Sequence, residues 1–397
     1  MWADRHVVVG VTGGIACYKA CHLVRRLVEA GARVDVVLTR GAAEFVQPLT
    51  FEALSGRPVL ASLWEPERAL DHVRLGQTAD LIVVAPATAH FLGRLAAGMA
   101  DDFLTALCLA RTKPLLVAPA MNDAMFAADA TQENLRRLTD RGVAVVGPER
   151  GALAEGPSDR PGRMSEPETI LHHAARALSG RSSLAGRRVV VTAGPTREAL
   201  DPVRVITNRS SGKMGFRIAQ AAWYRGASVR LISGPSGEPD PVGVEVERIE
   251  TTAQLGQAVR QALPTANVLI MAAAPADYRP TVPLDRKRPR QAGPLSVELE
   301  PTEDILAATR PIRKPGALMV GFVPETGQAV EKAAAKLVKK GLDLIVANDA
   351  LEPGAGFEVD TNRVTIIDAS WGKQVVPFGT KAEVAEAIVK AVEVRLG

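Results

Sequence analysis

Short, continuously apolar runs, each followed by a stretch with helical periodicity, are the feature that most limits how this chain can fold. Runs of this kind are typical of strands that are buried on both faces of a sheet. The regular alternation of strand and helix therefore predicts a parallel sheet covered by helices on both sides, a doubly wound α/β architecture. In the first part of the chain the expected strands are Val7–Thr12, Val34–Leu38, Leu81–Ala85, Leu115–Ala118 and Val143–Val146.

A second series of the same kind begins after a break in this pattern. A helix at Pro167–Leu178 is followed by Ser179–Arg187, a small and polar stretch with the composition of a linker. We therefore expect two Rossmann-like parallel-sheet domains, residues 1–180 and 187–397. The second set of strands is Val189–Thr192, Val229–Ile232, Val268–Ala273, Leu318–Phe322 and Leu342–Ala347. Its helices lie around Met214–Arg225, Gln254–Leu263, Ala329–Lys340 and Lys381–Arg395.

Composition favours a cytoplasmic protein that binds small molecules. With 397 residues and 47% hydrophobic content, the chain can bury the cores of two domains. The net charge is only +4, and basic residues are dispersed apart from Arg286–Arg290, which suits anionic small ligands better than nucleic acid. No apolar stretch approaches the ~20 residues that span a membrane, and the chain starts directly with a strand, so we expect neither export nor membrane insertion. Cys17, Cys21 and Cys108 form no CxxC pair and no even set, so we expect reduced core thiols.

Glycines and polar side chains follow the buried strands of the first domain. Gly13 and Gly14 lie at the first strand-to-helix turn, where glycines let the backbone approach a phosphate at a helix N-terminus. Taken alone, such a turn also occurs without a ligand. It gains weight from APATA, which contains Thr88, and from PAMNDAMF, which contains Asn122. Both follow strands at their carboxyl ends, where doubly wound sheets bind ligands.

The order of these motifs resembles that of flavin-dependent cysteine decarboxylases. TGGIACYK, HVRLGQTAD, APATA, AAGMADD and PAMNDAMF occur in the family's order, and the domain is similar to phosphopantothenoylcysteine decarboxylase. The resemblance implies FMN bound at a subunit interface, usually in a trimer, with contacts from Gly13, Gly14, Thr39 and Thr88. It also implies a reaction in which the substrate thiol is oxidised to a thioaldehyde, carbon dioxide is lost to give an enethiolate, and the reduced flavin restores the saturated thiol.

Two further residues of this domain receive roles from the resemblance. His72 would act as the base or proton relay near the thiol, and Asn122 would hold the substrate carboxylate. The chemistry is sensible, because a near-neutral imidazole can take a thiol proton and an uncharged amide can bind a carboxylate that must leave. Without the other motifs, a histidine ahead of an apolar segment is better interpreted as a helix-capping or surface residue.

The segment Glu149–Met164 departs from the family. It is rich in Gly, Pro, Arg and Ser without a period, which predicts a long exposed loop. Family members carry a cysteine here that supplies the proton completing the reduction, whereas this chain has Glu155. A glutamic acid can donate a proton if closure over an apolar site raises its pKa. The alternatives are a solvated loop charge at Glu155, a reaction that stops at the oxidised enethiol, or a domain that only binds flavin and assists oligomerisation or regulation.

The run TAGPTREALDPVRVITNRSSGKMG opens the second domain and is its most specific signal. Its small residues precede a helix and can cradle a phosphate, with Arg204 and Lys213 nearby. SSGKMG lacks the full GxxxxGK[ST] spacing, which argues against a P-loop NTPase, and no proper GxGxxG supports a nicotinamide-dependent dehydrogenase. The run is similar to phosphopantothenate-cysteine ligase, and AAAPADYR, DRKRPRQ, GF followed by ET, and AND continue in that family's order.

This second resemblance implies that the phosphopantothenate carboxylate attacks the α-phosphate of CTP, assisted by a divalent cation, normally Mg²⁺. The cysteine amine then displaces CMP from the acyl-cytidylate. Lys287 is implied to stabilise charge on the phosphate oxygens, and Asn208 to bind the acyl carbonyl. Lys336 and Lys340, which share one helix face, are implied to hold the triphosphate. The other implied contacts are Asp277, Asp304 and Phe322 for the nucleotide, and Arg204, Ser210, Ser211 and Lys213 for the substrate.

The expected function is a bifunctional enzyme of coenzyme A biosynthesis. By analogy with the two families, a trimeric flavin domain is joined to a dimeric ligase domain. Without the surrounding motifs, the paired lysines would be a solvated helix face and the cluster around Lys287 a basic loop. The residues leave the choice of CTP over ATP and the metal ligands open.

Overall fold

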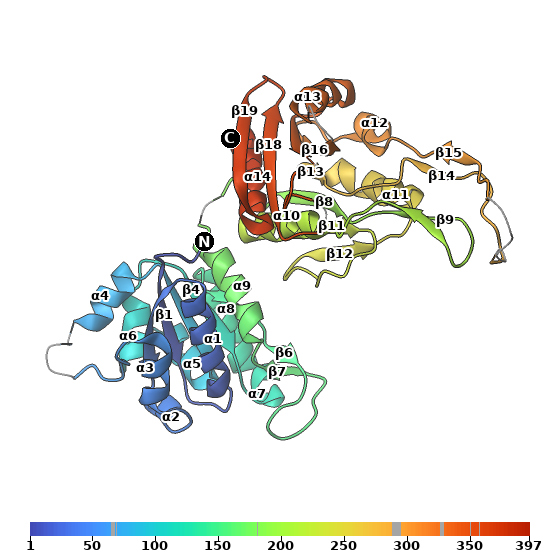
Figure 1. Ribbon diagram of the computed structural model, residues 1–397. Coiled ribbons are helices and arrows are strands. Elements are labelled where there is room, and N and C mark those ends of the chain that lie inside the picture. The colour runs from blue at the N-terminus through green and yellow to red at the C-terminus, as the bar shows by residue number, and fades with distance from the viewer. Residues whose placement is uncertain are drawn as a thin grey trace. The chain divides into compact units, whose positions relative to one another are not determined.

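The computed structural model describes residues 1–64, 68, 70–180, 182–287, 295–325, 329–349, 351–356 and 358–397. The chain forms two compact units, Met1–Gly180 and Arg181–Gly397 (Figure 1). Each unit is described by itself.

The first unit is built on a parallel sheet with the strand order β2-β1-β3-β4-β5. Its strands are β1 (His6–Val11), β2 (Arg33–Leu38), β3 (Leu81–Ala87), β4 (Leu115–Pro119) and β5 (Ala144–Val145). In register, Val9 of β1 pairs with Val36 of β2 on one side and with Val83 of β3 on the other. The predicted strands are confirmed in place and order, although the last of them is reduced to a pair of residues.

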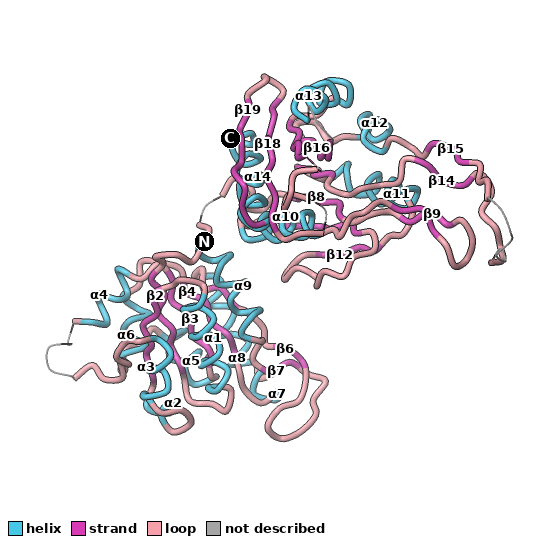
Figure 2. Tube along the Cα trace, in the orientation of Figure 1, coloured by secondary structure: helices cyan, strands magenta, loops and turns pink. Residues whose placement is uncertain are grey.

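Helices cover both faces of this sheet because successive residues of β1 point to opposite sides. Val7, Val9 and Val11 belong to one buried cluster, and Val8 belongs to another. The first cluster is closed by α1 (Cys17–Glu29), α3 (Pro48–Ser55) and α9 (Pro167–Leu178). The second is closed by α4 (Asp71–Thr78), α5 (Ala89–Ala97), α6 (Phe103–Ala110) and α8 (Asp129–Asp140), while α2 (Arg40–Ala43) and α7 (Asp123–Ala127) are short (Figure 2).

The segment predicted as a long exposed loop contains a β-hairpin. Strands β6 (Glu149–Arg150) and β7 (Pro161–Arg163) pair antiparallel, and Met164 is buried at the end of the segment. A ladder this short leaves no alternating pattern in the sequence, so the prediction of an aperiodic exposed loop was wrong for its base. Cys17 and Cys108 are buried and Cys21 is partly buried, all as free thiols, as predicted.

The second unit is built on a mixed sheet with the order β12-β11-β8-β13-β16-β17-β18-β19. Its members are β8 (Arg188–Ala193), β11 (Ser228–Ser233), β12 (Glu245–Arg248), β13 (Val268–Met271), β16 (Leu318–Glu325), β17 (Leu344–Asp349), β18 (Thr361–Asp368) and β19 (Lys373–Thr380). The pairs from β12 to β17 are parallel, as predicted. Strands β18 and β19 add an antiparallel edge that the prediction missed. The short turn between them can join strands only in that direction.

Helices cover both faces of the second sheet as well. On one face lie α10 (Lys213–Tyr224) and α14 (Lys381–Leu396). On the other lie α11 (Thr252–Ala262), α12 (Ile305–Thr309) and α13 (Ala329–Lys340), with 3₁₀ turns at Leu263–Thr265 and Arg310–Ile312. Within the described part of the chain, no helix is both long and apolar enough to cross a bilayer.

Two small ribbons extend from the second unit beyond its main sheet (Figure 1). One pairs β9 (Arg197–Ala199) with β10 (Val205–Thr207), and the other pairs β14 (Tyr278–Pro280) with β15 (Leu299–Pro301). We call them the two arms. Each ladder is too short to give a strand signal in the sequence, and the arms were not predicted.

Candidate functional site

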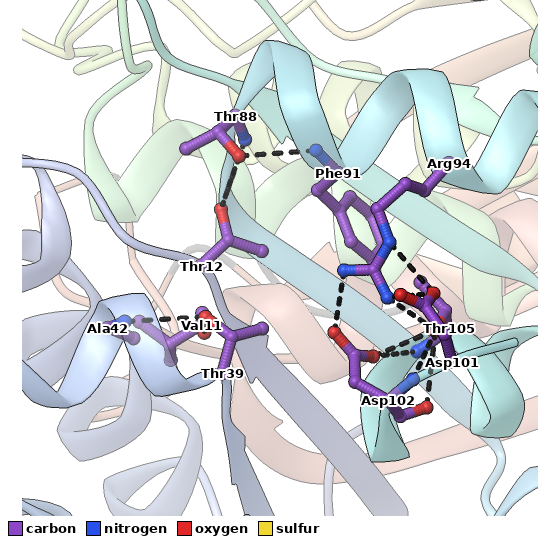
Figure 3. Close-up of polar contacts among 10 residues, drawn as sticks. All are labelled: Val11, Thr12, Thr39, Ala42, Thr88, Phe91, Arg94, Asp101, Asp102 and Thr105. Carbon is purple, nitrogen blue, oxygen red and sulfur yellow. Dashed lines mark hydrogen bonds and ion pairs between the residues drawn. The ribbon is translucent and has the colours of Figure 1, made fainter. Parts of the chain in front are cut away.

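A large pocket lies at the carboxyl ends of the strands of the first unit. Its volume is about 810 Å³, within the range of pockets that bind drug-sized ligands. The turns after β1, β2 and β3 supply Thr12, Thr39 and Thr88 to its wall (Figure 3). Strands β1 and β3 end side by side here, which is where doubly wound sheets bind ligands.

These threonines hold one another and the helix starts in place. The Thr12 hydroxyl donates to the carbonyl of Pro86 at 2.8 Å and accepts from the Thr88 amide at 3.0 Å. Thr88 caps α5 and Thr39 caps α2 through their Oγ1 atoms (Figure 3). Gly13 is required sterically, because a Cβ there would lie 2.6 Å from the carbonyl carbon of Gly41. The predicted residues Gly13, Gly14, Thr39 and Thr88 therefore line a single pocket.

A charged wall of this pocket was missed by the sequence prediction. Arg94 of α5 lies 2.7 Å from Asp102 through Nη1 and also pairs with Asp101 (Figure 3). Burial alone would lower the pKa of Arg94, but the hydrogen bonds to Asp101 and Asp102 outweigh it and raise that pKa. Asp102 also caps α6 through Thr105. The AAGMADD motif contained both aspartates, but only the fold shows that they converge on Arg94.

The hairpin segment Glu149–Met164, which we call the flap, brings Glu155 to Asn122. Leu153 and Gly156 exchange backbone hydrogen bonds of 2.8 and 3.1 Å, so Glu155 lies in a tight turn at the flap tip. Asn122 Nδ2 donates to Glu155 Oε1 at 3.4 Å, and Ser158 Oγ donates to Asp123 Oδ2 at 2.7 Å. The structure therefore places the two predicted residues Asn122 and Glu155 together in the wall of the pocket.

A buried cation supports the stem of the flap. The side chain of Lys19 is 8% exposed, and its Nζ donates to the carbonyl of Met164 at 3.2 Å and to Glu166 Oε1 at 2.9 Å. The hydrogen bond from Lys19 is the main reason that the pKa of Glu166 is lowered. Lys19 lies within the quoted motif TGGIACYK, but a lysine in an amphipathic helix gave no reason to place it beneath a pocket.

His72 lies apart from the other predicted residues of this unit. It is on α4 and lines a separate surface depression of about 490 Å³ together with Leu63, Trp64 and Leu109. Its ring meets Phe103 edge-on at 6.1 Å between centroids. Its Nδ1 is buried and has no hydrogen-bond partner among the described residues. His72 and Asn122 therefore line different depressions of one unit.

Two predicted residues of the second unit, Asn208 and Asp277, lie at the loop that follows β13. Asn208 follows β10 and donates through Nδ2 to the carbonyls of Ala274 and Pro275 at 3.3 and 2.8 Å. The same loop leads to Asp277, whose carbonyl accepts from the Thr302 amide at 2.9 Å. Phe322 of β16 is partly buried and packs against the core cluster that also holds Val191 of β8 and Ile270 of β13.

The residues predicted to bind the substrate lie in the turn before α10 and in the arm next to it. Ser210 and Ser211 precede the helix, and the Ser211 carbonyl accepts from Ser236 Oγ at 2.7 Å. Arg204 lies beside β10 and its Nη1 is 3.7 Å from Asp201. Lys213 is engaged with Asp360 at 2.6 Å and with the carbonyl of Glu358 at 3.2 Å. Its amine is thus paired with a carboxylate, which sequence reasoning did not foresee.

The predicted triphosphate residues are only partly brought together. Lys340 Nζ lies 3.2 Å from Asp304, which caps α12, and Lys336 is one turn earlier on α13. Lys287 is exposed and ends a described stretch, and the following residues 288–294 lie outside the described part of the chain. Residue 326 of the predicted Glu325-Thr326 pair also lies outside it.

Comparison with known proteins covers both units. The family model described as "Flavoprotein" matches residues 1–179, and the model described as "DNA/pantothenate metabolism flavoprotein C-terminal domain" matches residues 184–395. The Coenzyme A biosynthesis bifunctional protein CoaBC of Vibrio cholerae is 44% identical over 393 residues, which cover 98% of this chain and 97% of that protein. The protein of the same name from Mycobacterium tuberculosis is 45% identical, covering 98% and 96%. That of Escherichia coli is 42% identical, covering 99% and 98%. The chain therefore belongs to the family of coenzyme A biosynthesis bifunctional proteins CoaBC.

Proposed function

We propose that this chain makes 4'-phosphopantetheine in two consecutive reactions. The second unit joins 4'-phosphopantothenate to cysteine at the expense of CTP, and the first unit then decarboxylates the product with FMN. The family membership supports the pair of reactions, and the observation that carries the assignment of the first unit is the pocket that unites Gly13, Thr39, Thr88, Asn122 and Glu155. The proposal includes the cytoplasmic location expected from the sequence.

The pocket of the first unit fits FMN in size and in chemistry. Its volume suits a nucleotide-sized ligand. The backbones of Gly13 and Gly41 approach each other closely, and the backbone amides and threonine hydroxyls at the nearby helix starts can bind a phosphate. We propose Gly13, Gly14, Thr39 and Thr88 as the residues that hold it. FMN, when bound, supplies the oxidation of the substrate thiol and its later reversal.

Asn122 and Glu155 are proposed to act on the substrate in this pocket. Asn122 Oδ1 caps α7 by accepting from the Ala124 amide at 2.9 Å, which orients its Nδ2 toward the flap. An amide held in this way can bind the substrate carboxylate without adding a charge that would hinder its loss. Glu155 is 3.4 Å from that amide, so a proton on its carboxyl group lies within reach of the same substrate. We assign Glu155 as the proton donor that completes the reduction.

His72 is proposed to act in the pocket of a neighbouring copy. Large apolar side chains are exposed around it, with Trp64 87% and Leu109 60% exposed. The rim of the flavin pocket is also apolar, with Ile15 63% and Tyr18 55% exposed. Two different apolar surfaces on one unit can pair head to tail, and such pairing forms a ring when the rotation between neighbours closes. A trimer of the first unit would bury both surfaces and carry each His72 to a neighbour's pocket.

The ligase reaction is proposed to use residues of the second unit in two roles. Asn208, which is hydrogen-bonded to the 274–276 loop, is assigned to the acyl group, and Asp277, which follows that loop, is assigned to the nucleotide. Lys336 and Lys340 are assigned to the triphosphate, and Asp304 holds Lys340 in place. Lys287 is assigned to the phosphate charge that builds up during attack, with Phe322 at the nucleotide and Arg204, Ser210, Ser211 and Lys213 at the substrate phosphate.

The described residues provide no ready-made cluster of protein ligands for Mg²⁺. Among the described residues, no group of three His, Cys, Asp or Glu side chains could hold a metal ion. Magnesium usually keeps several waters and binds through substrate phosphates with few protein ligands. We therefore propose that Mg²⁺ enters with the nucleotide.

The two arms are proposed to form the contact between two copies of the ligase unit. They expose apolar side chains that a lone unit leaves in water, among them Val203 (63% exposed), Val205 (43%) and Tyr278 (53%). Because β9 and β14 lie together, these side chains form one surface on the two arms. Pairing of that surface would give a dimer.

Product analysis by mass tests both reactions at once. The purified protein is incubated with phosphopantothenate, cysteine, CTP and Mg²⁺, and ATP replaces CTP in a parallel reaction. Formation of phosphopantetheine supports the proposal. Accumulation of phosphopantothenoylcysteine, or of a product two hydrogens lighter than phosphopantetheine, would instead favour an active ligase with an impaired flavin unit. That alternative arises because Glu155 stands in place of the family's cysteine. Absence of any ligation would contradict the proposal.

A further inference from the structure

Threonine hydroxyls from separate elements hold the backbone of Ala276 in the second unit. Thr196 lies between β8 and β9, Thr252 is the first residue of α11, and both side chains are buried, with residue exposures of 1% and 2%. Thr302 follows β15 and donates through Oγ1 to the Ala276 carbonyl at 2.6 Å. Ala276 itself is 3% exposed. A polar network this deeply buried is costly unless every member is satisfied.

The hydrogen bonds of Thr196, Thr252 and Ala276 close into a ring. The Ala276 amide donates to Thr196 Oγ1 at 2.8 Å, and Thr196 Oγ1 lies 2.8 Å from Thr252 Oγ1. Thr252 Oγ1 donates to the Ala276 carbonyl at 3.5 Å. Either hydroxyl can donate in the bond between Thr196 and Thr252, and when Thr252 donates to the carbonyl, Thr196 donates to Thr252. Each hydroxyl then accepts one hydrogen bond and donates one, and both the backbone N–H and the backbone C=O of Ala276 have a partner.

This ring adjoins the loop whose carbonyls accept hydrogen bonds from the Asn208 side-chain amide. Asn208 Nδ2 donates to the carbonyls of Ala274 and Pro275, the residues that lead into Ala276. On the other side, Thr207 Oγ1 donates to the Thr196 carbonyl at 2.7 Å, which fixes the residue just before Asn208. Thr196 thus acts on Asn208 in two ways. Its hydroxyl holds Ala276, next to the carbonyls that accept from the Asn208 amide, and its carbonyl holds Thr207, next to Asn208 in the chain.

We propose that Thr196 is a positioning residue of the ligase reaction, acting through Asn208. This inference rests on the proposed function of the second unit. A reacting group displaced by about 1 Å can cost roughly 100-fold in rate. Loss of the Thr196 hydroxyl leaves the buried Ala276 amide without its acceptor and removes the hydrogen bond between Thr196 and Thr252, so the 274–276 loop and the amide it holds can shift together.

The test compares Thr196→Val, Thr196→Ser and Thr309→Val in the full-length protein. Valine keeps the shape of threonine without its hydroxyl, and serine keeps the hydroxyl. Thr309 is the control, because it is fully buried and its Oγ1 donates to the Ile305 carbonyl at 2.6 Å, away from the ring. Pyrophosphate release and formation of phosphopantothenoylcysteine are measured well below the melting temperature of each variant. We expect T196V to lower kcat for ligation about 10- to 100-fold, T196S to restore it, and T309V to retain it.

A second measurement follows the Asn208 amide itself. The protein is labelled with ¹⁵N on asparagine, the side-chain signal of Asn208 is assigned with N208D, and exchange of its NH₂ protons is compared between variants. Faster exchange and a shifted signal in T196V, absent in T309V, would support positioning. Wild-type rates together with an unchanged signal in T196V, or equal rate losses in T196V and T309V, would overturn it.

If T196V fails to fold, T302V, which loses the other hydroxyl on the Ala276 carbonyl, decides the question with the same readouts. If the unsubstituted protein does not ligate, the proposed function fails and the NMR comparison alone decides the inference.

Discussion

Glu155, an exposed side chain at the flap tip, is the proposed proton donor of the first unit. We expect E155Q, which keeps the shape without the acidic proton, to lower the rate of the final reduction roughly 100-fold or more. The product two hydrogens lighter than phosphopantetheine should then accumulate, while ligation stays normal. Mass analysis of the products measures this. E155C, which installs the residue that the resemblance implies, should restore turnover.

The control for this variant lies in the same flap. Asp159 is also exposed, and D159N removes a neighbouring loop charge without touching Asn122. If D159N stalls the reaction as strongly as E155Q does, the effect belongs to flap charge in general. A fully active E155Q would show that the proton comes from elsewhere.

Asp35 links stability to pH in the first unit. Burial alone would raise the pKa of Asp35, but hydrogen bonds from His6 and Arg57 outweigh it and hold that pKa below its ordinary value. Because the folded pKa is depressed, the stabilisation is fully present above the unfolded pKa of about 3.9 and is lost as pH falls through the folded pKa. We expect D35N to cost about 3 kcal/mol at pH 7 and clearly less at pH 3.5, measured by urea unfolding. An equal cost at both pH values would contradict the assignment.

At the scale of elements, helix α10 packs against β8 with no room for a side chain at Gly215. A Cβ there would lie 2.5 Å from the Cβ of Ala193 and 2.9 Å from the carbonyl oxygen of Thr192. Since a backbone carbonyl cannot move aside easily, G215A must displace the helix start that follows Ser210 and Ser211. We expect a loss of about 1–3 kcal/mol in the free energy of unfolding and a raised KM for phosphopantothenate.

Gly237 supplies the matched comparison for this prediction. Nothing lies within 4 Å of a Cβ at that position, and its backbone is not in the left-handed region. G237A should leave both stability and KM close to those of the unsubstituted protein. If G215A behaves like G237A in urea unfolding and in ligase kinetics, the close packing of α10 on β8 contributes neither to stability nor to substrate binding.

At the scale of the whole molecule, the proposed trimer depends on the apolar surface around His72. Leu109 is 60% exposed on α6 and lines the same depression as His72. We expect L109E to lower the sedimentation coefficient, because a charge buried between copies would lack a partner. It should also reduce decarboxylation while ligation continues. V394E, which changes a still more exposed residue on α14 (74%), should leave the assembly of the flavin units intact. An unchanged sedimentation profile for L109E would exclude this surface from the interface.

The sequence by itself predicted the alternating strands and helices of both units. The helices Pro167–Leu178 and Ala329–Lys340 were predicted at their observed bounds, and the turns that carry Gly13, Thr88 and Asn122 were assigned to one sheet edge, where they line one pocket. These features follow from periodicity and from motifs at strand ends, which are local properties of the chain. The short ladders of the flap and the arms escaped prediction because a strand of two or three residues leaves no period.

Only the tertiary structure decided which side chains meet. It placed His72 on a different surface from Asn122, paired Lys213 with Asp360, and brought Arg94 and Asp102 together in the wall of the pocket, with Asp101 as a second partner of Arg94. It also added the antiparallel strands β18 and β19 to a sheet expected to be parallel. The sequence determined the elements because each depends on residues a few positions apart. The contacts between elements depend on how the chain packs over long separations, and no local pattern encodes them.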